Sequence, residues 1–344
     1  MDYRLIGRTG LKVSPLALGT MMFGPWGNDD VDDSIRIIHR ALDAGINLVD
    51  TADIYSEGGS EEIVGKALEG RRDDVVLATK FFVPMSDKPN ESGGSRKWIM
   101  REVENSLRRL RTDYIDLYQV HRPDAEMDVE ETLGALTDLV RQGKVRYIGS
   151  SSYSGSQIVE AQWASRDRNL ERFVTEQPPY SMIVRGAEND VFPALQRHGV
   201  GSLTYSPLTG GWLSGKYRKN GNEPVVASHA RKRLAARFDL STPANQRKLD
   251  AVDQLARVAD DAGVTLIELA IAFVIRHPGV TSAIIGPRTM EQLESQLPAA
   301  GIHLTDDVLD RIDEIVVPGV TINPEDDSYG ISELAPSARR RELR

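Results

Sequence analysis

The segment NLVDTADIYSEGGSEEIVGKAL, which begins at Asn47, combines an apolar run with polar side chains that could do chemistry. The apolar part is typical of a buried strand, and Asp50, Asp53 and Tyr55 follow at its end. An acid and a phenol at a strand end are consistent with turn chemistry, because aspartate stabilises turns and caps helices. They are equally consistent with an active site, and the residues at the other strand ends must decide between these interpretations.

Two further residues with useful chemistry end other apolar runs. Lys80 ends VVLAT, where a charge is costly unless it is paired, and His121 ends YIDLYQV. With Asp50 and Tyr55 they form a set suited to carbonyl reduction, which needs a hydride and a proton. Tyrosine can give the proton, although its free pKa is about 10. A nearby ammonium lowers that pKa, an aspartate keeps the lysine charged, and a histidine orients the carbonyl oxygen.

Short apolar runs that alternate with longer amphipathic segments must position these residues. Most of the runs are apolar on both faces, as in a covered parallel sheet. We expect strands that begin near Leu16, Ile46, Asp74, Tyr114, Val145, Arg172, Gly201 and Thr281. We expect helices over residues 32–43, 60–68, 95–110, 129–141, 157–165, 190–198, 244–262 and 291–297. Strands that are each followed by a helix predict an α/β protein with a (β/α)8 TIM barrel.

An open doubly wound sheet is the alternative fold, and it usually carries a G-x-G-x-x-G turn after its first strand. The segment ALGTMMFG lacks this motif, which favours the barrel. No linker-like stretch interrupts the alternation, so we expect a single barrel domain over residues 1–344. Outside the alternation we expect an N-terminal hairpin over residues 3–13 that closes the bottom of the barrel, a long loop over 208–240 and a C-terminal tail over 317–344.

The composition excludes several classes of site. The chain has 344 residues, a net charge of −9 and no cysteine, so disulfides, thiolate metal sites and cysteine nucleophiles are excluded. Its acidic balance argues against binding to nucleic acid or anionic membranes. A metal-dependent barrel hydrolase ranks low, and no metal site is expected, because the 6 histidines form no H-x-H pattern. The sequence shows neither a secretory signal nor a bilayer-spanning stretch, so we expect a cytoplasmic protein.

At these residues the sequence resembles the aldo-keto reductase family, in its bacterial and potassium-channel beta-subunit branch. The resemblance covers about residues 3–296, in GRTGLKVSPLALGTMMFG, GINLVDTADIYSEGGSEEIVGKAL, VVLATK and YIDLYQVHRPD. It implies reversible, NADP(H)-dependent reduction of aldehyde or ketone carbonyls to alcohols, with hydride from NADPH and a proton from Tyr55. It also implies that Asp50 and Lys80 lower the tyrosine pKa and that His121 orients the carbonyl.

The resemblance further implies that NADPH lies extended across the barrel mouth without a Rossmann motif. Nicotinamide-end contacts of the family match Gly19, Thr20, Met21, Asp50, Ser151, Ser152, Gln177 and Tyr205. The glycine-rich start of the loop over 208–240 resembles a segment that covers the pyrophosphate, with expected contacts Ser206, Pro207, Leu208, Gly210 and Lys216. Expected contacts of the adenosine 2′-phosphate end are Gly286, Arg288, Gln292 and Gln296. A bidentate pair between Arg288 and the 2′-phosphate predicts preference for NADPH over NADH.

The substrate is expected to be a small-molecule carbonyl or alcohol. Its pocket should include Trp26, Tyr55, Phe82 and His121, with a contribution from the tail near residues 326–329. An alternative from another class is a cofactor-bound regulatory or binding subunit that resembles the potassium-channel beta subunits. Because the catalytic set is expected in both classes, turnover of an aldehyde with NADPH must separate them. The sequence predicts neither the oligomeric state nor the physiological substrate.

Overall fold

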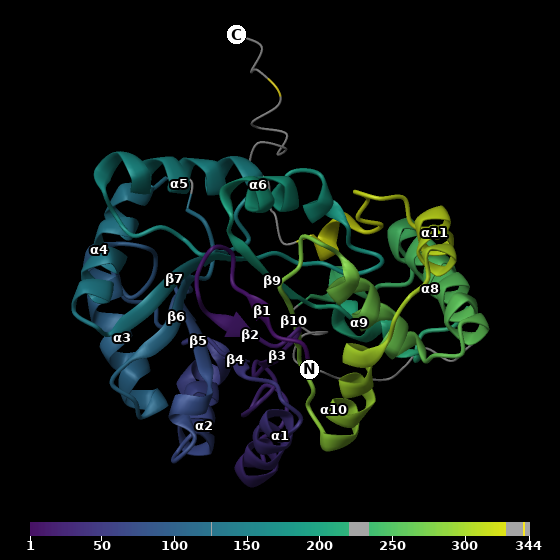
Figure 1. Ribbon diagram of the computed structural model, residues 1–344, viewed down its shortest axis with the longest axis horizontal. Coiled ribbons are helices and arrows are strands. Elements are labelled where there is room, and N and C mark those ends of the chain that lie inside the picture. The colour runs from purple at the N-terminus through teal and green to yellow at the C-terminus, as the bar shows by residue number, and fades with distance from the viewer. Residues whose placement is uncertain (125, 220–233, 328–339, 341–344) are drawn as a thin grey trace.

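The computed structural model describes residues 1–124, 126–219, 234–327 and 340. Its parallel strands close into a barrel in the order β10-β3-β4-β5-β6-β7-β8-β9, and helices surround the barrel (Figure 1). The strands are β3 (Leu16–Gly19), β4 (Leu48–Asp50), β5 (Val76–Phe81), β6 (Ile115–Val120), β7 (Val145–Ser151), β8 (Thr175–Gln177), β9 (Gly201–Tyr205) and β10 (Ser282–Ile285). The predicted (β/α)8 TIM barrel is confirmed.

Each predicted helix is present, with ends that differ by a few residues. These helices are α1 (Val31–Asp43), α2 (Gly59–Ala67), α3 (Arg96–Leu110), α4 (Val129–Arg141), α5 (Gly155–Arg168), α6 (Val191–His198), α8 (Pro243–Asp261) and α10 (Met290–Gln296). Two additional helices, α9 (Leu266–Arg276) and α11 (Asp306–Ile315), were not predicted as part of the alternation. Most of α9 is buried, so its apolar residues surround the helix and leave no amphipathic stripe.

The predicted N-terminal hairpin closes one end of the barrel. Its strands β1 (Arg4–Leu5) and β2 (Lys12–Val13) pair antiparallel, and Figure 1 shows the hairpin across the near end of the barrel. Ile6 and Val13 are fully buried against the side chains inside the barrel. Gly7 has a φ of 52°, and a Cβ there would lie 2.4 Å from the carbonyl oxygen of Gly199. Gly199 precedes β9, so the hairpin covers the end where the strands begin.

The inside of the barrel carries an alternating pattern that positions the site. Apolar side chains fill its lower part, among them Leu48, Ala78 and Leu117. Because side chains on a strand alternate between faces, the residues two positions further along point inward too. Those residues are Asp50, Lys80 and Gln119, so the inner positions change from apolar to polar at the carboxyl end of the barrel.

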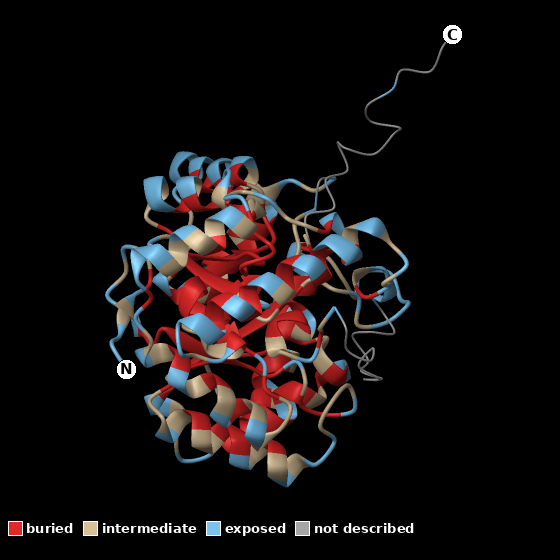
Figure 2. Ribbon diagram, turned by 90° about the vertical axis from the view of Figure 1, so that its right-hand side faces the viewer, coloured by how far each residue is buried: buried red, intermediate tan, exposed pale blue. Residues whose placement is uncertain are grey.

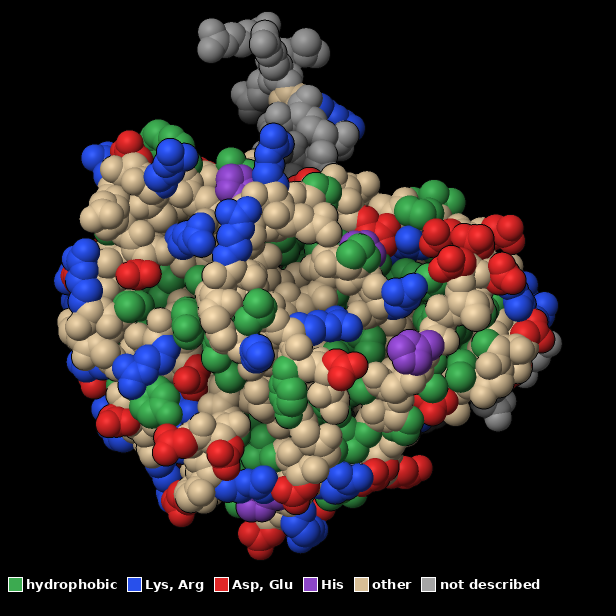
Figure 3. Space-filling view, in the orientation of Figure 1, with side chains coloured by type: hydrophobic (Ala, Val, Ile, Leu, Met, Phe, Trp, Pro, Cys, Tyr) green, Lys and Arg blue, Asp and Glu red, His purple; other side chains and the backbone are tan. Residues whose placement is uncertain are grey.

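A second apolar cluster lies between the strands and the helices. Figure 2 shows buried residues in the strands and on the inward sides of the helices, with exposed residues on their outward sides. On the hairpin side, Figure 3 shows charged side chains of both signs, with acidic side chains gathered over α11. Throughout the described ranges, the helices are too short or too polar to cross a lipid bilayer.

Parts of two predicted segments lie outside the described residues. These parts are residues 220–233 of the expected cofactor-covering loop, and residues 328–339 and 341–344 of the expected tail. The described start of the loop contains the short helix η4 (Thr209–Ser214), and its end contains η5 (Ala235–Arg237). The described part of the tail contains η7 (Pro324–Asp326).

Candidate active site

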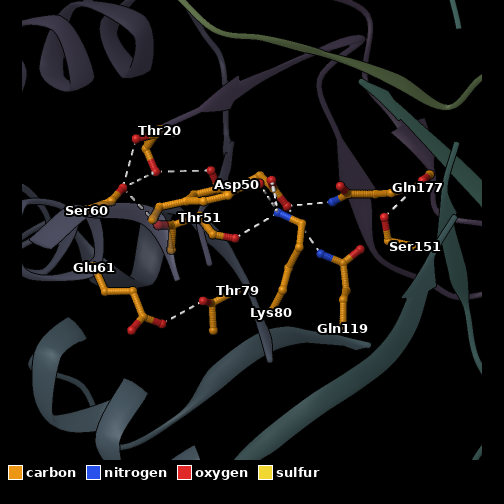
Figure 4. Close-up of polar contacts among 11 residues, drawn as sticks. Thr20, Asp50, Thr51, Ser60, Glu61, Thr79, Lys80, Gln119, Ser151 and Gln177 are labelled. Atoms are coloured by element: carbon orange, nitrogen blue, oxygen red, sulfur yellow. Dashed lines mark hydrogen bonds and ion pairs between the residues drawn. The ribbon is translucent and has the colours of Figure 1, made fainter. Parts of the chain in front are cut away.

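Polar side chains from four strands converge at the carboxyl end of the barrel (Figure 4). The ammonium Nζ of Lys80, on β5, lies 2.5 Å from Oδ1 of Asp50, on β4, and donates to the carbonyl oxygen of Thr51 at 2.8 Å. Oδ2 of Asp50 accepts hydrogen bonds from the amide nitrogens of Gln177, at 2.6 Å, and Gln119, at 3.2 Å. Both carboxylate oxygens are therefore occupied, and the ion pair is held from several sides.

Tyr55 reaches this ion pair from the turn that follows β4. Its hydroxyl lies 3.4 Å from Nζ of Lys80, at the long end of hydrogen-bond range. The short helix η1 (Tyr55–Gly58) begins at this tyrosine, and Ser56 and Glu57 take positive φ values of 50° and 56°. The ring of His121 lies edge-on to the Tyr55 ring, with 5.7 Å between the centroids. The structure therefore brings together the predicted set of aspartate, tyrosine, lysine and histidine.

Burial and neighbouring charges set the protonation states of this set. Burial acts to lower the pKa of Lys80, but the carboxylate of Asp50 and the Tyr55 hydroxyl raise it more, so the lysine stays an ammonium. Burial raises the pKa of Tyr55, and the opposing effect of Lys80 does not reverse this rise. Burial, together with the charges of Lys80 and Arg122, lowers the pKa of His121 well below its usual value, so the imidazole is neutral.

The Tyr55 result corrects the sequence-based expectation of a tyrosine with a lowered pKa. Lys80 has the expected sign of effect, but the desolvation of a buried phenol is larger, and the charge of Asp50 raises the Tyr55 pKa instead of lowering it. The phenol is therefore fully protonated at neutral pH and has a proton to give. The lysine reduces the cost of forming the phenolate without making the phenolate the resting form.

The nicotinamide-end candidates also gather at this mouth. Gly19 is the register partner of Asp50 across β3 and β4, and the exposed Met21 lies in the loop beyond. The Thr20 hydroxyl contacts the carbonyl oxygen of Asp50 at 3.2 Å. From β7, Ser151 donates to the carbonyl oxygen of Gln177 at 3.1 Å. Gln177, also expected at the nicotinamide end, donates an N–H of its side-chain amide to Asp50.

Ser152 and the loop after β9 continue this rim. The Ser152 hydroxyl lies 3.3 Å from the hydroxyl of Tyr205, at the end of β9. Beyond Tyr205, Ser206 and Gly210 take left-handed φ values of 60° and 63°, so the chain turns at both residues at the start of the expected cofactor-covering loop. Pro207 is buried, Leu208 is half-buried, and Lys216 is exposed further along.

The adenosine-end candidates lie on the loop after β10 and on α10. The backbone N–H of Arg288 donates to Oε1 of Gln292 at 2.8 Å, and its carbonyl accepts from Asn28 at 3.0 Å. Gly286 is exposed, whereas Gln296 is only 5% exposed within α10. The loops after β9, β10 and β3 are neighbours in the barrel, so the candidate contacts for an extended dinucleotide form one continuous stretch of the mouth.

Of the candidate substrate residues, Trp26 and His121 have rings beside that of Tyr55. The rings of Trp26 and Tyr55 have centroids 6.3 Å apart, and the half-buried Phe82 follows β5 with a φ of 125°. Of the tail expected near the pocket over residues 326–329, Asp326 is buried and forms a 2.6 Å ion pair with Lys248 on α8, and residues 328–329 lie outside the described residues. In the described ranges, no group of three or more histidine or acidic side chains is placed to hold a metal ion.

Sequence reasoning missed three groups of this site. Gln119 lies two residues before His121 on β6, so the alternation of inward positions could have identified it. The carbonyl of Thr51, which accepts from Lys80, carries no signal in the sequence. The third is the guanidinium of Arg122, which follows His121 directly and donates a hydrogen bond to the hydroxyl of Ser152.

Comparison with known proteins places this site in a family. The Aldo/keto reductase family model matches residues 15–317. An uncharacterized oxidoreductase, YrpG, of Bacillus subtilis is 41% identical over 92% of this chain and 96% of its own length. A probable voltage-gated potassium channel subunit beta of Arabidopsis thaliana is 38% identical over 92% of this chain and 97% of its own length. The aldo-keto reductase YhdN of Bacillus subtilis is 37% identical over 98% and 99% of the two chains. The chain belongs to the aldo/keto reductase family.

Proposed function

We propose that this protein reduces aldehyde or ketone carbonyls to alcohols, reversibly, with NADPH as the hydride donor and Tyr55 as the proton donor. The main support for this proposal is the position of the Lys80 ammonium at the carboxyl end of the barrel. It lies 2.5 Å from the Asp50 carboxylate and 3.4 Å from the Tyr55 hydroxyl. Active sites of TIM barrels lie at this end. Family membership supports an oxidoreductase that acts on carbonyl compounds.

In this proposal each residue of the set has one task. Tyr55 stays protonated until the carbonyl oxygen gains negative charge, and then donates its proton. Lys80 stabilises the resulting phenolate, because its own pKa is raised and it stays charged. The neutral imidazole of His121 orients the carbonyl oxygen, and Asp50 holds the lysine. The alcohol forms with one hydride on carbon and one proton on oxygen.

The mouth of the barrel fits a nicotinamide dinucleotide. A reduced nicotinamide, when bound, supplies the hydride. Gln177, Ser151, Ser152 and Tyr205 would hold its ring end, and the left-handed backbone at Ser206 and Gly210 would allow the loop to approach a pyrophosphate closely.

Arg288 supports the proposed preference for NADPH. Among the described residues, no carboxylate forms an ion pair with the Arg288 guanidinium. The backbone of Arg288 is held by hydrogen bonds with the side chains of Gln292 and Asn28. A guanidinium without a counter-charge suits a 2′-phosphate, which it can bind in bidentate fashion.

The test is a turnover assay with the purified protein, NADPH and a panel of neutral aldehydes and ketones. We expect aldehyde-dependent loss of the NADPH absorbance and formation of the corresponding alcohol. Wild-type protein that binds NADPH but consumes none with any carbonyl of the panel contradicts the proposal.

A second candidate function is that of a cofactor-bound regulatory subunit, and the similarity to a probable potassium channel subunit beta of Arabidopsis thaliana favours it. NADPH binding without turnover, together with capture of a defined membrane protein, is the outcome that selects this candidate.

A further inference from the structure

The guanidinium of Arg122 occupies a position at the mouth that the proposed reaction does not use. Arg122 follows His121 directly, at the carboxyl end of β6, and its side chain is half-buried. Its Nη1 donates a hydrogen bond to the hydroxyl of Ser152, which lies 3.3 Å from the Tyr205 hydroxyl. The ends of β6, β7 and β9 thus orient this cation beside the candidate carbonyl site.

The charge of Arg122 acts on the two residues that would contact the carbonyl. Burial raises the pKa of Tyr55, and Arg122 is one of the charges that oppose this rise. The pKa of His121 is lowered by burial and then by Lys80 and Arg122. Any ligand held by Tyr55 and His121 therefore lies within the electrostatic reach of this guanidinium.

Unlike Arg72, Arg109 and Arg185, Arg122 has no acidic partner among the described residues. Arg109 contacts Glu61 and Glu102, each at 2.6 Å. Arg72 pairs with an aspartate at 2.8 Å, and Arg185 pairs with a glutamate at 2.9 Å. Within the described ranges, no carboxylate forms such a pair with Arg122.

Glu176, whose pKa Arg122 acts to lower, does not neutralise the charge of this arginine. Burial raises the pKa of Glu176 to about 8, so this side chain is mostly uncharged at neutral pH. Its oxygens are already engaged, since Ser150 donates to one at 2.5 Å and the backbone N–H of Tyr153 donates to the other at 3.0 Å. The mouth therefore holds a cation without a charged partner, in a chain whose net charge is −9.

We propose that Arg122 binds a carboxylate or phosphate at the non-reacting end of the substrate, so that the preferred substrates are aldehydes or ketones that carry such an anion. This inference rests on the proposed function. A guanidinium binds either anion through paired N–H groups, and its hydrogen bond to Ser152 restricts the side chain before the substrate arrives. Recognition of a charged group by such hydrogen bonds corresponds to about a 10- to 100-fold preference.

The first experiment compares substrates that differ only in this charge. The ortho, meta and para carboxybenzaldehydes are assayed against the corresponding carboxamides, and glyceraldehyde phosphate against glyceraldehyde. We expect the wild type to favour at least one anion in kcat/KM by about tenfold or more. The preferred isomer shows how far from the aldehyde the anion binds. The preferred anion shows whether the site takes a carboxylate or a phosphate.

The second experiment replaces the cation. Arg122→Gln should reduce the preference for the anionic member of the pair about tenfold or more, mainly through KM, and Arg122→Lys should keep part of it. Arg146→Gln is the matched control, because Arg146 lies at the opposite end of β7, where it donates to the carbonyl of Gly143, and should keep the wild-type preference. A wild type without preference, or an Arg122→Gln variant that keeps the wild-type preference, overturns the inference.

Binding separates this inference from the proposed reaction. Benzoate should bind the NADP⁺-loaded wild type more tightly than benzamide does, measured calorimetrically, and Arg122→Gln should remove the difference. If no aldehyde is reduced, the proposed function fails, and the benzoate measurement still decides the role of Arg122. Weaker NADP⁺ binding by Arg122→Gln, with benzoate and benzamide bound alike by the wild type, assigns the arginine to the dinucleotide and contradicts the inference.

Discussion

The side-chain amide of Gln177 donates a 2.6 Å hydrogen bond to Oδ2 of Asp50, although the two residues are 127 positions apart in the chain. This bond crosses the inside of the barrel from β8 to β4. It leaves Oδ1 of Asp50 to Lys80, at 2.5 Å. The orientation of the aspartate that holds the lysine, and through it the geometry around Tyr55, is therefore fixed from the far side of the barrel.

The buried ion pair between Asp50 and Lys80 predicts a large stability effect. Lys80→Met leaves a buried carboxylate without its cation and should reduce the free energy of unfolding by about 3–5 kcal/mol. The double variant Asp50→Asn/Lys80→Met removes that charge and should recover part of the loss. Denaturant unfolding measures both. Arg71→Met, which removes an exposed pair with Asp43, is the control and should cost about 1 kcal/mol or less.

If Lys80→Met proves as stable as the wild type, the two side chains do not form a buried pair in solution. A double variant less stable than Lys80→Met would show that the amide of asparagine cannot accept the hydrogen bonds that now reach Asp50.

Removal of the Tyr55 hydroxyl tests the proton donor. Tyr55→Phe should lower kcat for aldehyde reduction by about 10²- to 10⁴-fold, because the transition state loses its general acid. NADPH binding, followed by fluorescence quenching, should persist. Tyr114→Phe is the matched control, since that hydroxyl contacts Asp73 at 3.1 Å near the start of β6, at the opposite end of the barrel. Wild-type turnover by Tyr55→Phe rules out the assigned role.

Arg288 predicts the choice of dinucleotide. Arg288→Ala should raise the KM for NADPH about 10- to 100-fold and change the KM for NADH far less, because only NADPH carries the 2′-phosphate. Initial rates with each dinucleotide at saturating aldehyde give both constants. Arg257→Ala, on the exposed side of α8, is the control and should change neither. Equal effects of Arg288→Ala on the two dinucleotides contradict the assignment.

The buried acid Glu176 predicts how stability depends on pH. Its pKa is raised from 4.5 to about 8 in the folded protein, mainly by burial. Below a pH of about 4.5 both states hold the proton, and between about 4.5 and about 8 only the unfolded state releases it, so this group destabilises the fold as pH rises through that window. Glu176→Gln mimics the protonated acid and removes this effect.

The melting temperature of Glu176→Gln relative to wild type should therefore rise between about pH 5 and about pH 9. Comparison with the wild type at each pH cancels the contributions of the other titrating groups. A difference that stays constant over this range would mean that Glu176 is ionised in the fold at neutral pH.

The barrel and the positions of the catalytic candidates could be predicted from the sequence because both depend on local periodicity. Short runs apolar on both faces predict covered parallel strands, and the carboxyl ends of such strands meet at one face. Asp50, Lys80 and His121 each stand at the end of a predicted strand. Once these strands close into a barrel, the three side chains must meet at the same end. The helix α9 escaped the alternation because it is buried nearly all round and lacks the amphipathic pattern.

What the sequence could not decide depends on burial and on partners far along the chain. The sequence shows that a tyrosine stands at position 55 and a lysine at position 80. Whether the tyrosine pKa is raised or lowered depends on the desolvation of the folded site, which has a larger effect than the lysine. The 2.6 Å pairing of Asp326 with Lys248 places a residue expected at the substrate pocket in a buried ion pair. The sequence alone determined which side chains stand at the strand ends, since alternation along a strand is local. The tertiary structure decided which of them meet, which are charged and which lack a partner, since these properties depend on contacts between distant segments.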